Sequence, residues 1–204
     1  MSDDTPGPIA LAITGASGSA YALRLLECLI GAGRQVYLMI SRAGQIVIKM
    51  ESCLELPGQP AEVQRLLAER FDAEPGQLEV FGRQQWMAPV ASGSNPPEAM
   101  VVCPCTTGTL AAIACGASND LLERAADVML KERRKLILVV RETPFSDIHL
   151  ENMLKLSRMG AVIMPANPGF YYHPESVQDL VNFMVARVLD QLHIEQDLLP
   201  RWGE

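Results

Sequence analysis

The sequence lacks any apolar run of about eighteen residues, the length that a helix needs to cross a membrane. It also lacks a basic leader, because its first residues, MSDDTPGP, are acidic and polar. Lys and Arg are outnumbered, with 17 against 24 Asp and Glu and a net charge of −7. This balance argues against nucleic acid as a general partner, since phosphate backbones are bound by clustered cations. We therefore predict a cytoplasmic protein that binds neither nucleic acid nor membrane.

Cysteine and histidine are too few and too scattered for a disulfide framework or a metal cluster. The odd number of cysteines, spread through apolar segments, is typical of reduced, buried thiols. The pair Cys103 and Cys105 has no second Cys/His cluster beside it, so it is a poor zinc signature, and the histidines show no ligand spacing. We predict no metal site. The residues concerned are Cys28, Cys53, Cys103, Cys105, Cys115, His149, His173 and His193.

Apolar runs alternate with helical patterns along the chain, and 49% of its 204 residues are hydrophobic. Such alternation predicts βαβ units and a parallel sheet. We expect a single α/β domain over residues 1–204, three-layered, doubly wound and flavodoxin- or Rossmann-like. The predicted strands are Pro8–Ile13, Gln35–Ile40, Leu78–Phe81, Ala99–Cys103, Leu136–Val140 and Ala161–Met164.

The stretch TGASGS, residues 14–19, joins the first predicted strand to a helical pattern over Ala20–Leu29. A glycine-rich loop at a helix start presents backbone N–H groups to an anion, so phosphates bind there. The spacing is neither G-x-G-x-x-G nor a P-loop, which weakens the NAD and ATP interpretations. A turn without a ligand stays open as an alternative. Ser17 can contact a bound ring or phosphate, or cap the helix.

Small, polar or charged segments follow five of the predicted strands. The carboxyl ends of parallel strands share one edge, where ligands bind, so we expect these segments to converge. Two of them are Gly-, Ser- and Thr-rich helix starts and one carries an arginine, which predicts a phosphorylated ligand. The segments are Gly15–Ser17, Ser41, Pro104–Thr109, Arg141–Glu142 and Pro165–Tyr172.

Further cations lie on two predicted helices. Arg124 and Lys131 share one face of NDLLERAADVMLKERRK, which by pattern alone is equally typical of a solvated surface. Arg187 has apolar neighbours in VQDLVNFMVARVLDQL, so we expect it to meet an anion, a carboxylate or another subunit. The segment from Met87 to Met100, rich in Pro, Gly and Ser, is predicted to be a surface loop beside the site.

Taken together, these segments resemble the UbiX/Pad-type flavin prenyltransferases over nearly the whole chain. The resemblance is carried by TGASGSAYALRLLE, by VVCPCTTGTLAAIACGASNDLLERAADVMLKERRKLILVVRETPFSDIHLENMLKLSRMGA and by PANPGFYYHPESVQDLVNFMVARVLDQL. It implies a flavodoxin-like fold, usually a dodecamer, that binds FMN. The implied reaction joins the dimethylallyl group of dimethylallyl phosphate to N5 and C6 of reduced FMN, and the product serves a UbiD-type decarboxylase.

The resemblance also implies roles for particular residues. The implied FMN contacts are Gly15, Ala16, Ser17, Ser41, Thr106, Thr107, Gly108, Thr109 and Arg141. The implied substrate contacts are Trp86, Arg124, Lys131, Arg141, Glu142, Tyr171, Arg187 and Trp202. The candidate catalytic residues are Ser17, Glu51, Glu142 and Lys131, with Glu51 the preferred base.

The residue types suit this chemistry. Cations stabilise the departing phosphate, and the π surface of Trp86 stabilises an allyl cation. Because that cation must not meet water, we expect a closed pocket shared between subunits, with the tail over about 193–204 packed at the interface. The sequence leaves the phosphate and pyrophosphate donors, the pathway and the exact proton-transfer roles open.

Two alternatives remain. A phosphopantothenoylcysteine-type decarboxylase has the same fold and uses FMN, but it depends on a histidine after the second strand and a PASANT-like loop. Here those regions read SRAGQIVIKMESC and PCTTGT. A flavin carrier without chemistry needs the FMN loops but has no need of Glu51, Lys131 and Arg187.

Overall fold

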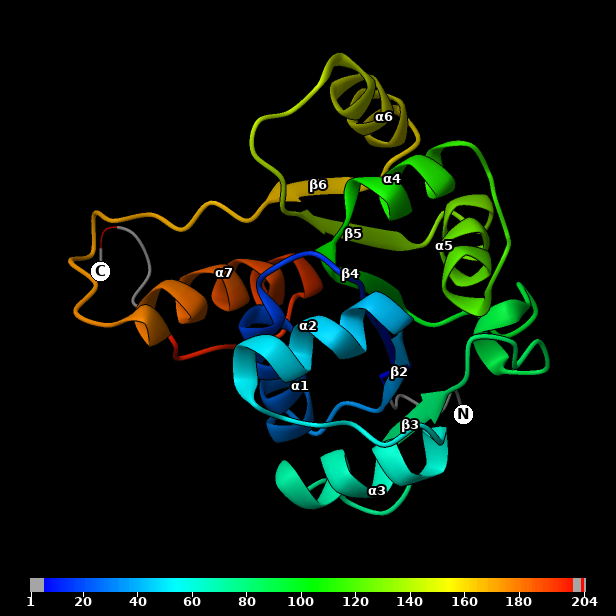
Figure 1. The fold of residues 1–204 in the computed structure, drawn as a ribbon, viewed down its shortest axis with the longest axis horizontal. Coiled ribbons are helices and arrows are strands. Elements are labelled where there is room, and N and C mark those ends of the chain that lie inside the picture. Colours follow the sequence, from blue (N-terminus) through cyan, green and yellow to red (C-terminus); the bar gives the residue numbers. More distant parts are fainter. Residues whose placement is uncertain (1–5, 200–202, 204) are drawn as a thin grey trace.

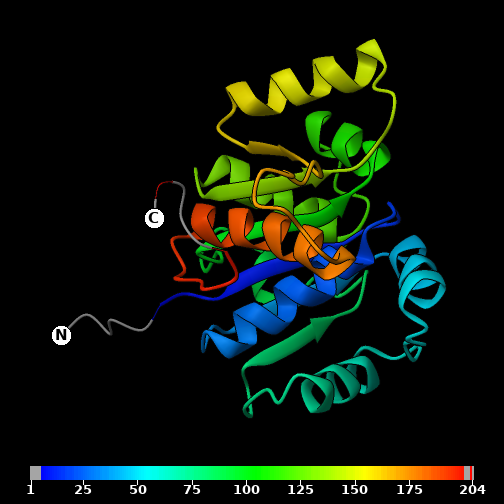
Figure 2. The same ribbon diagram turned by 90° about the vertical axis from the view of Figure 1, so that its left-hand side faces the viewer.

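A six-stranded, fully parallel sheet organises the chain in the computed structural model, which describes residues 6–199 and 203. The strand order is β3-β2-β1-β4-β5-β6, so the direction of winding reverses between β1 and β4. Strand arrowheads lie on the same side of the molecule in Figure 2. The strands are β1 (Ile9–Ile13), β2 (Val36–Ile40), β3 (Leu78–Phe81), β4 (Ala99–Cys105), β5 (Lys135–Val140) and β6 (Val162–Pro165).

Helices cover both faces of the sheet, giving three layers. Apolar residues of α1, α2, α3 and α7 pack in one core, and those of α4, α5 and α6 pack in the other. In Figure 1, α6 and α3 mark opposite ends of the molecule. The helices are α1 (Ser19–Gly31), α2 (Arg42–Ser52), α3 (Pro60–Arg70), α4 (Thr107–Ala114), α5 (Leu121–Lys131), α6 (Asp147–Arg158) and α7 (Val177–Leu192).

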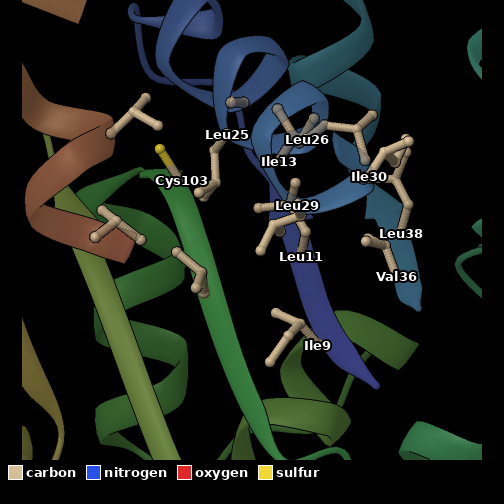
Figure 3. Packing of buried hydrophobic residues seen from close by; sticks show 14 of the residues in the cluster. Ile9, Leu11, Ile13, Leu25, Leu26, Leu29, Ile30, Val36, Leu38 and Cys103 are labelled. Carbon is tan, nitrogen blue, oxygen red and sulfur yellow. The ribbon is translucent and has the colours of Figure 1, made fainter. Parts of the chain in front are cut away.

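Strand β1 separates the two cores because successive side chains point to opposite faces. Ile9, Leu11 and Ile13 belong to the core of α1 and α7, whereas Ala10 and Ala12 belong to the other. All five are at most 1% exposed, as expected for a strand buried on both faces. Figure 3 shows Ile9, Leu11 and Ile13 along β1 beside the leucines of α1.

The fold confirms the predicted α/β class and all six strands. The largest difference is at β4, which continues through Pro104 to Cys105 instead of ending at Cys103. Its register against β5 shifts between Val102 and Cys105, where the proline has no N–H to donate. In the part of the chain that the structure describes, no helix is long and apolar enough to cross a membrane.

The prediction of buried thiols is only partly right. Cys103 and Cys105 are buried, and burial raises both pKa values, that of Cys105 to about 12, so both remain protonated thiols. Cys28 is partly buried, but Cys53 and Cys115 are exposed. Cys53 directly follows α2 and Cys115 directly follows α4, and helix ends lie near the surface. All five are free cysteines, in agreement with the absence of a disulfide framework.

The tail packs back on its own chain as far as the structure describes it. Ile194 and Leu198 lie against the core of α1 and α7. The backbone N–H groups of Leu198 and Leu199 both donate to the side-chain oxygen of Gln196. Contact of this tail with another subunit stays a prediction, and Trp202 lies outside the described residues.

Candidate functional site at the carboxyl edge of the sheet

The segments that follow five strands lie in one row at the carboxyl edge, as predicted. Hydrogen bonds join each segment or strand end to the next across the sheet. They run from Ser41 N to Ile13 O (2.9 Å), from Thr106 N to Thr14 Oγ1 (2.9 Å), from Arg141 N to Cys105 O (3.3 Å) and from Ala166 N to Val140 O (2.9 Å). The row crosses the point where the strand order reverses, which is where open α/β sheets bind ligands.

The first loop of this row approaches α2 very closely. A side chain at Gly15 would overlap the Cβ of Ala43, and one at Gly44 would lie 2.7 Å from the carbonyl oxygen of Ile13. Ser41 caps α2 by accepting a hydrogen bond from Gly44 N at 3.0 Å. Glycine at positions 15 and 44 therefore lets the end of β1 and the loop after it lie against the first turn of α2.

The start of α1 faces an anion that the chain itself supplies. The carboxylate of Glu51 accepts hydrogen bonds from Gly18 N at 3.0 Å, and from Ser19 N and Ser19 Oγ at 2.8 Å each. We expected phosphate to bind at this helix start, but a carboxylate from the last turn of α2 already accepts the N–H groups of Gly18 and Ser19. Ser17 is exposed and does not cap the helix; the capping position is Gly18.

The charge of Glu51 is stabilised in this position. Burial alone raises the pKa of the carboxyl, but hydrogen bonds from the side chains of Ser17 and Ser19 and from the backbone of Ser19 and Gly18 outweigh burial. The net effect lowers the pKa of Glu51 below its ordinary value of 4.5, so the group is a carboxylate at neutral pH. It can accept a proton, although its lowered pKa makes it a weak base.

The second glycine-containing loop begins α4. Thr106 caps this helix by accepting from Thr109 N at 3.0 Å, and its hydroxyl also donates to Thr109 Oγ1 at 2.9 Å. Gly108 is exposed, and a side chain there would meet only Thr106 Oγ1, at 3.9 Å. The backbone between Thr107 and Thr109 is therefore open to a ligand.

Arg141 and Glu142 complete this edge directly after β5. Arg141 is exposed and its backbone is fixed by the bond to Cys105 O, so its charge is available at the edge. Glu142 is half-buried and accepts from Thr143 N at 3.1 Å. This part of the site thus holds one cation and one carboxylate side by side.

Arg124 and Lys131 lie along α5, where Arg124 contacts the short helical turn at Pro89–Ala91 and Lys131 lies against the loop that follows it. Arg124 donates to Ala91 O at 3.0 Å and pairs with Asp127 at 2.7 Å. Lys131 pairs with Glu132, and Gly93 lies directly against this pair. The loop predicted beside the site therefore packs on the two cations of α5.

Arg187 pairs with Asp190 one turn further along α7, at 2.5 Å. Of the three partners expected for Arg187, the structure shows the carboxylate. Its side chain is 51% exposed and lines a cavity of about 580 Å³ with Tyr171, Phe183 and His193. The ring of Tyr171 packs edge-on against Phe183, with centroids 5.9 Å apart.

One chain brings together the predicted FMN contacts but not the predicted substrate contacts. Arg124 and Lys131 lie on α5, whereas Tyr171 and Arg187 lie with α7, and these helices pack on opposite faces of the sheet. The segments over 82–98 and 166–176 also lie on opposite sides of the molecule (Figure 1). Trp86 is 43% exposed, and its indole N–H donates to Gln84 at 3.2 Å.

Thr14 and Gly93 lie within segments that were quoted from the sequence, but neither residue was assigned a role at the site. Thr14 is 2% exposed and joins the loops after β1 and β4. Gly93 adjoins Lys131. A polar residue directly after a buried strand was the available signal for Thr14, and no local spacing marks Gly93. Among the described residues, no three His, Cys, Asp or Glu side chains gather as metal ligands would.

The fold and the row of strand ends define a nucleotide-binding α/β protein of the flavoprotein class. The family model described as Flavoprotein matches residues 2–189. Flavin prenyltransferase UbiX of Pseudomonas aeruginosa is 61% identical over 98% of this chain and 95% of its own length. The chain therefore belongs to the Flavoprotein family and, within it, to the flavin prenyltransferases.

Solved structures agree with this placement. A crystal structure of AnUbiX (PadA1) in complex with FMN and dimethylallyl pyrophosphate is 40% identical and superposes with a TM-score of 0.87, covering 98% of this chain and 99% of that one. A dodecameric, FMN-dependent UbiX-like decarboxylase from Escherichia coli O157:H7 is 39% identical with a TM-score of 0.85, covering 97% and 100%.

Proposed function

We propose that this chain is a flavin prenyltransferase that joins the dimethylallyl group of dimethylallyl phosphate to reduced FMN. The observation that carries the proposal is the arrangement at the carboxyl edge of the sheet. Hydrogen bonds there align two glycine-containing loops with Arg141, and the first loop lies against the anionic Glu51. A relative that is 61% identical and named a flavin prenyltransferase supports the same reaction. When bound, reduced FMN supplies the nucleophilic N5 and the C6 at which the fourth ring closes.

The donor set at this edge fits FMN. Arg141 provides a cation for a monophosphate, and the exposed backbone at Gly108 and the hydroxyl of Ser17 are polar contacts that a flavin can use. Glu51 occupies the start of α1, which leaves the loop from Thr106 to Thr109 as the better phosphate cradle. We propose that Gly15, Ala16 and Ser17 border the isoalloxazine ring instead.

Ser17 and Glu51 form a pair that can move a proton. Because the carboxylate of Glu51 is unprotonated and hydrogen-bonded to Ser17, the Ser17 hydroxyl can take a proton on its oxygen while passing its own to Glu51. Glu142 is a second carboxylate at the same edge and the other candidate for this work. Trp86, which is 43% exposed, is proposed to stabilise the allyl cation.

The prenyl phosphate is proposed to bind between subunits. The cations Arg124 and Lys131 lie on one face of the sheet and Arg187 lies on the other, so one chain cannot direct all three at one phosphate. A homo-oligomer, with a dodecamer as the proposed state, brings the α5 cations of one copy to the α7 surface of another. The dodecameric relative supports this assembly. Trp202 is proposed to join this interface.

Anaerobic incubation of the purified protein with reduced FMN and either dimethylallyl phosphate or dimethylallyl pyrophosphate tests the reaction directly. We expect mass spectrometry to show reduced FMN carrying one dimethylallyl group in place of a single hydrogen, because closing the ring at C6 adds one proton to the prenyl chain and releases another. Oxidised FMN and omitted donor are the controls. Release of CO2 from a cysteinyl substrate without prenylated product would overturn the proposal in favour of the cysteine decarboxylases, and bound FMN that is never prenylated would favour a carrier.

The proposed product, prenylated FMN, is a cofactor, and we propose that a UbiD-type decarboxylase uses it. We also propose that the transfer takes place in the cytoplasm. Mixing the prenylated product with an apo-decarboxylase and measuring CO2 release tests this partner. Unprenylated FMN is the matched control, and equal activity with both flavins would contradict the proposal.

A further inference from the structure

Thr14 is buried at the point where the sheet reverses its winding. It directly follows β1 and is 2% exposed, so water does not satisfy its hydroxyl. The hydroxyl instead donates to the carbonyl oxygen of Pro104 at 2.6 Å and accepts from the backbone N–H of Thr106 at 2.9 Å. Both partners are 90 or more positions away in the sequence.

This hydroxyl continues the pairing of β1 with β4 beyond the regular ladder. The matched pairs of the two strands run from Ile9 with Ala99 to Ala12 with Val102. Past this point β4 contains Pro104, which has no N–H, and the Thr14 backbone N–H reaches the Pro104 carbonyl only at 3.3 Å. The side chain of Thr14 supplies the two shorter bonds.

These hydrogen bonds connect the loop after β1 to the loop after β4. Thr14 is followed at once by Gly15, Ala16 and Ser17, and the N–H that it accepts belongs to Thr106, the cap of α4. The Thr14 hydroxyl therefore makes the two shorter hydrogen bonds that fix the distance between these loops, beside the longer backbone bond from Thr14 N–H.

We propose that Thr14 is a positioning residue that sets the spacing of the two loops for FMN. This inference rests on the proposed function, because it takes both loops as FMN contacts. Thr14 does not itself contact the flavin. Its hydroxyl holds the Thr106 backbone, and through it the open backbone at Gly108, at the right separation from Ser17.

Thr14→Val is the variant that removes the hydroxyl and keeps the branched shape. It leaves the carbonyl of the buried Pro104 and the N–H of the half-buried Thr106 without this partner, and we expect FMN to bind about tenfold more weakly or worse. Thr14→Ser keeps both hydrogen bonds and should restore the affinity to within about threefold of the wild type. Ile9→Val, at the opposite end of β1, is the control for a general loss of core packing.

Two measurements separate positioning from stability. The first is the dissociation constant for FMN of folded protein, checked by circular dichroism at a temperature well below every melting point. The second is amide hydrogen exchange without FMN, in which Thr14→Val should lose protection at Thr106 while Ile9→Val should not. If Thr14→Val does not fold, Thr14→Cys replaces it, since a thiol is a weak donor and acceptor and predicts a loss in the same direction.

A lowered melting temperature with unchanged FMN affinity and unchanged protection at Thr106 would overturn the inference, as would equal losses in Thr14→Val and Ile9→Val. Wild-type protein that binds no FMN would instead overturn the proposed function, and exchange at Thr106 would then still report whether Thr14 holds the loop.

Discussion

The carboxyl edge of the sheet and the cations of α5 and α7 differ in how complete they are within one chain. At the edge, hydrogen bonds between neighbouring strand ends hold the loops after β2, β1, β4, β5 and β6 in one row. Arg124, Lys131 and Arg187 instead lie on different faces, each paired with a carboxylate close in sequence. The groups proposed to bind FMN are thus held in one row within a single chain, whereas those proposed to bind the phosphate come together only if other copies contribute, as we propose.

The sharpest test of this division removes the cations one at a time. Lys131→Ala and Arg187→Ala should each lower prenylated product about 10–100-fold, because a lost hydrogen bond to a charged group costs about 1.5–3 kcal/mol. FMN affinity should stay near that of the wild type. Product mass analysis and flavin titration measure the two effects, with Arg65→Ala on α3 as the control. Loss of FMN binding would contradict the assignment of these cations to the prenyl phosphate, and wild-type rates would show that they have no role in the reaction.

Subunit mixing sharpens the same point. If Lys131 and Arg187 of one site come from different copies, co-expressing the two single variants should restore roughly a quarter of the sites, as random pairing in a symmetric oligomer predicts. Activity should rise well above that of either variant alone. Two differently tagged Lys131→Ala chains serve as the control and should recover nothing. No recovery in the mixed oligomer would place both cations in a site built by one chain.

Gly93→Ala probes the α5 half without changing a charge. The added Cβ would overlap Glu132 Oε1 and lie 2.6 Å from Lys131 Nζ, so the ends of these flexible side chains must move. We expect KM for dimethylallyl phosphate to rise about fivefold to tenfold, equivalent to about 1–1.4 kcal/mol, with little change in FMN affinity. Gly58→Ala, where an added Cβ meets nothing within 4 Å, is the control. Unchanged kinetics would show that Lys131 needs no fixed position.

Glu51→Gln has the smallest expected effect of these variants. It tests the hydrogen bonds that the carboxylate of Glu51 accepts at the start of α1. The pKa of Glu51 is lowered in the folded protein, so its charge adds stability above 4.5 that disappears as pH falls through the lower, folded value. Urea unfolding should show the variant about 0.5–1 kcal/mol less stable at pH 7, and the gap should shrink below pH 4.5. Glu55→Gln, which breaks an exposed pair with Lys49, is the control. A gap that does not change with pH would contradict the assigned charge.

The same variant bears on the reaction. Glutamine keeps the shape of Glu51 but cannot accept a proton, so prenyl transfer should slow after both substrates bind. Rapid-mixing flavin spectroscopy would locate the delay, and full wild-type turnover would remove Glu51 from the proton path.

Local patterns in the sequence determined the strands, the class of fold and the polar segments at the strand ends. A buried parallel strand needs a continuous apolar run, and a turn into a helix needs glycine or a capping hydroxyl, so both leave a local signature. The residues from Gly15 to Ser17 and from Thr106 to Thr109 could be found for that reason.

Tertiary structure alone decided which groups meet. Glu51 reaches Ser19 from 32 positions away, and Thr14 reaches Pro104 from 90. Only the close approach of α2 to β1 brings that carboxylate to the start of α1, where phosphate was expected. Arg124 and Arg187 look alike as helix cations in the sequence, yet the sheet lies between them, because which face a helix covers follows from the direction in which the chain crosses from strand to strand.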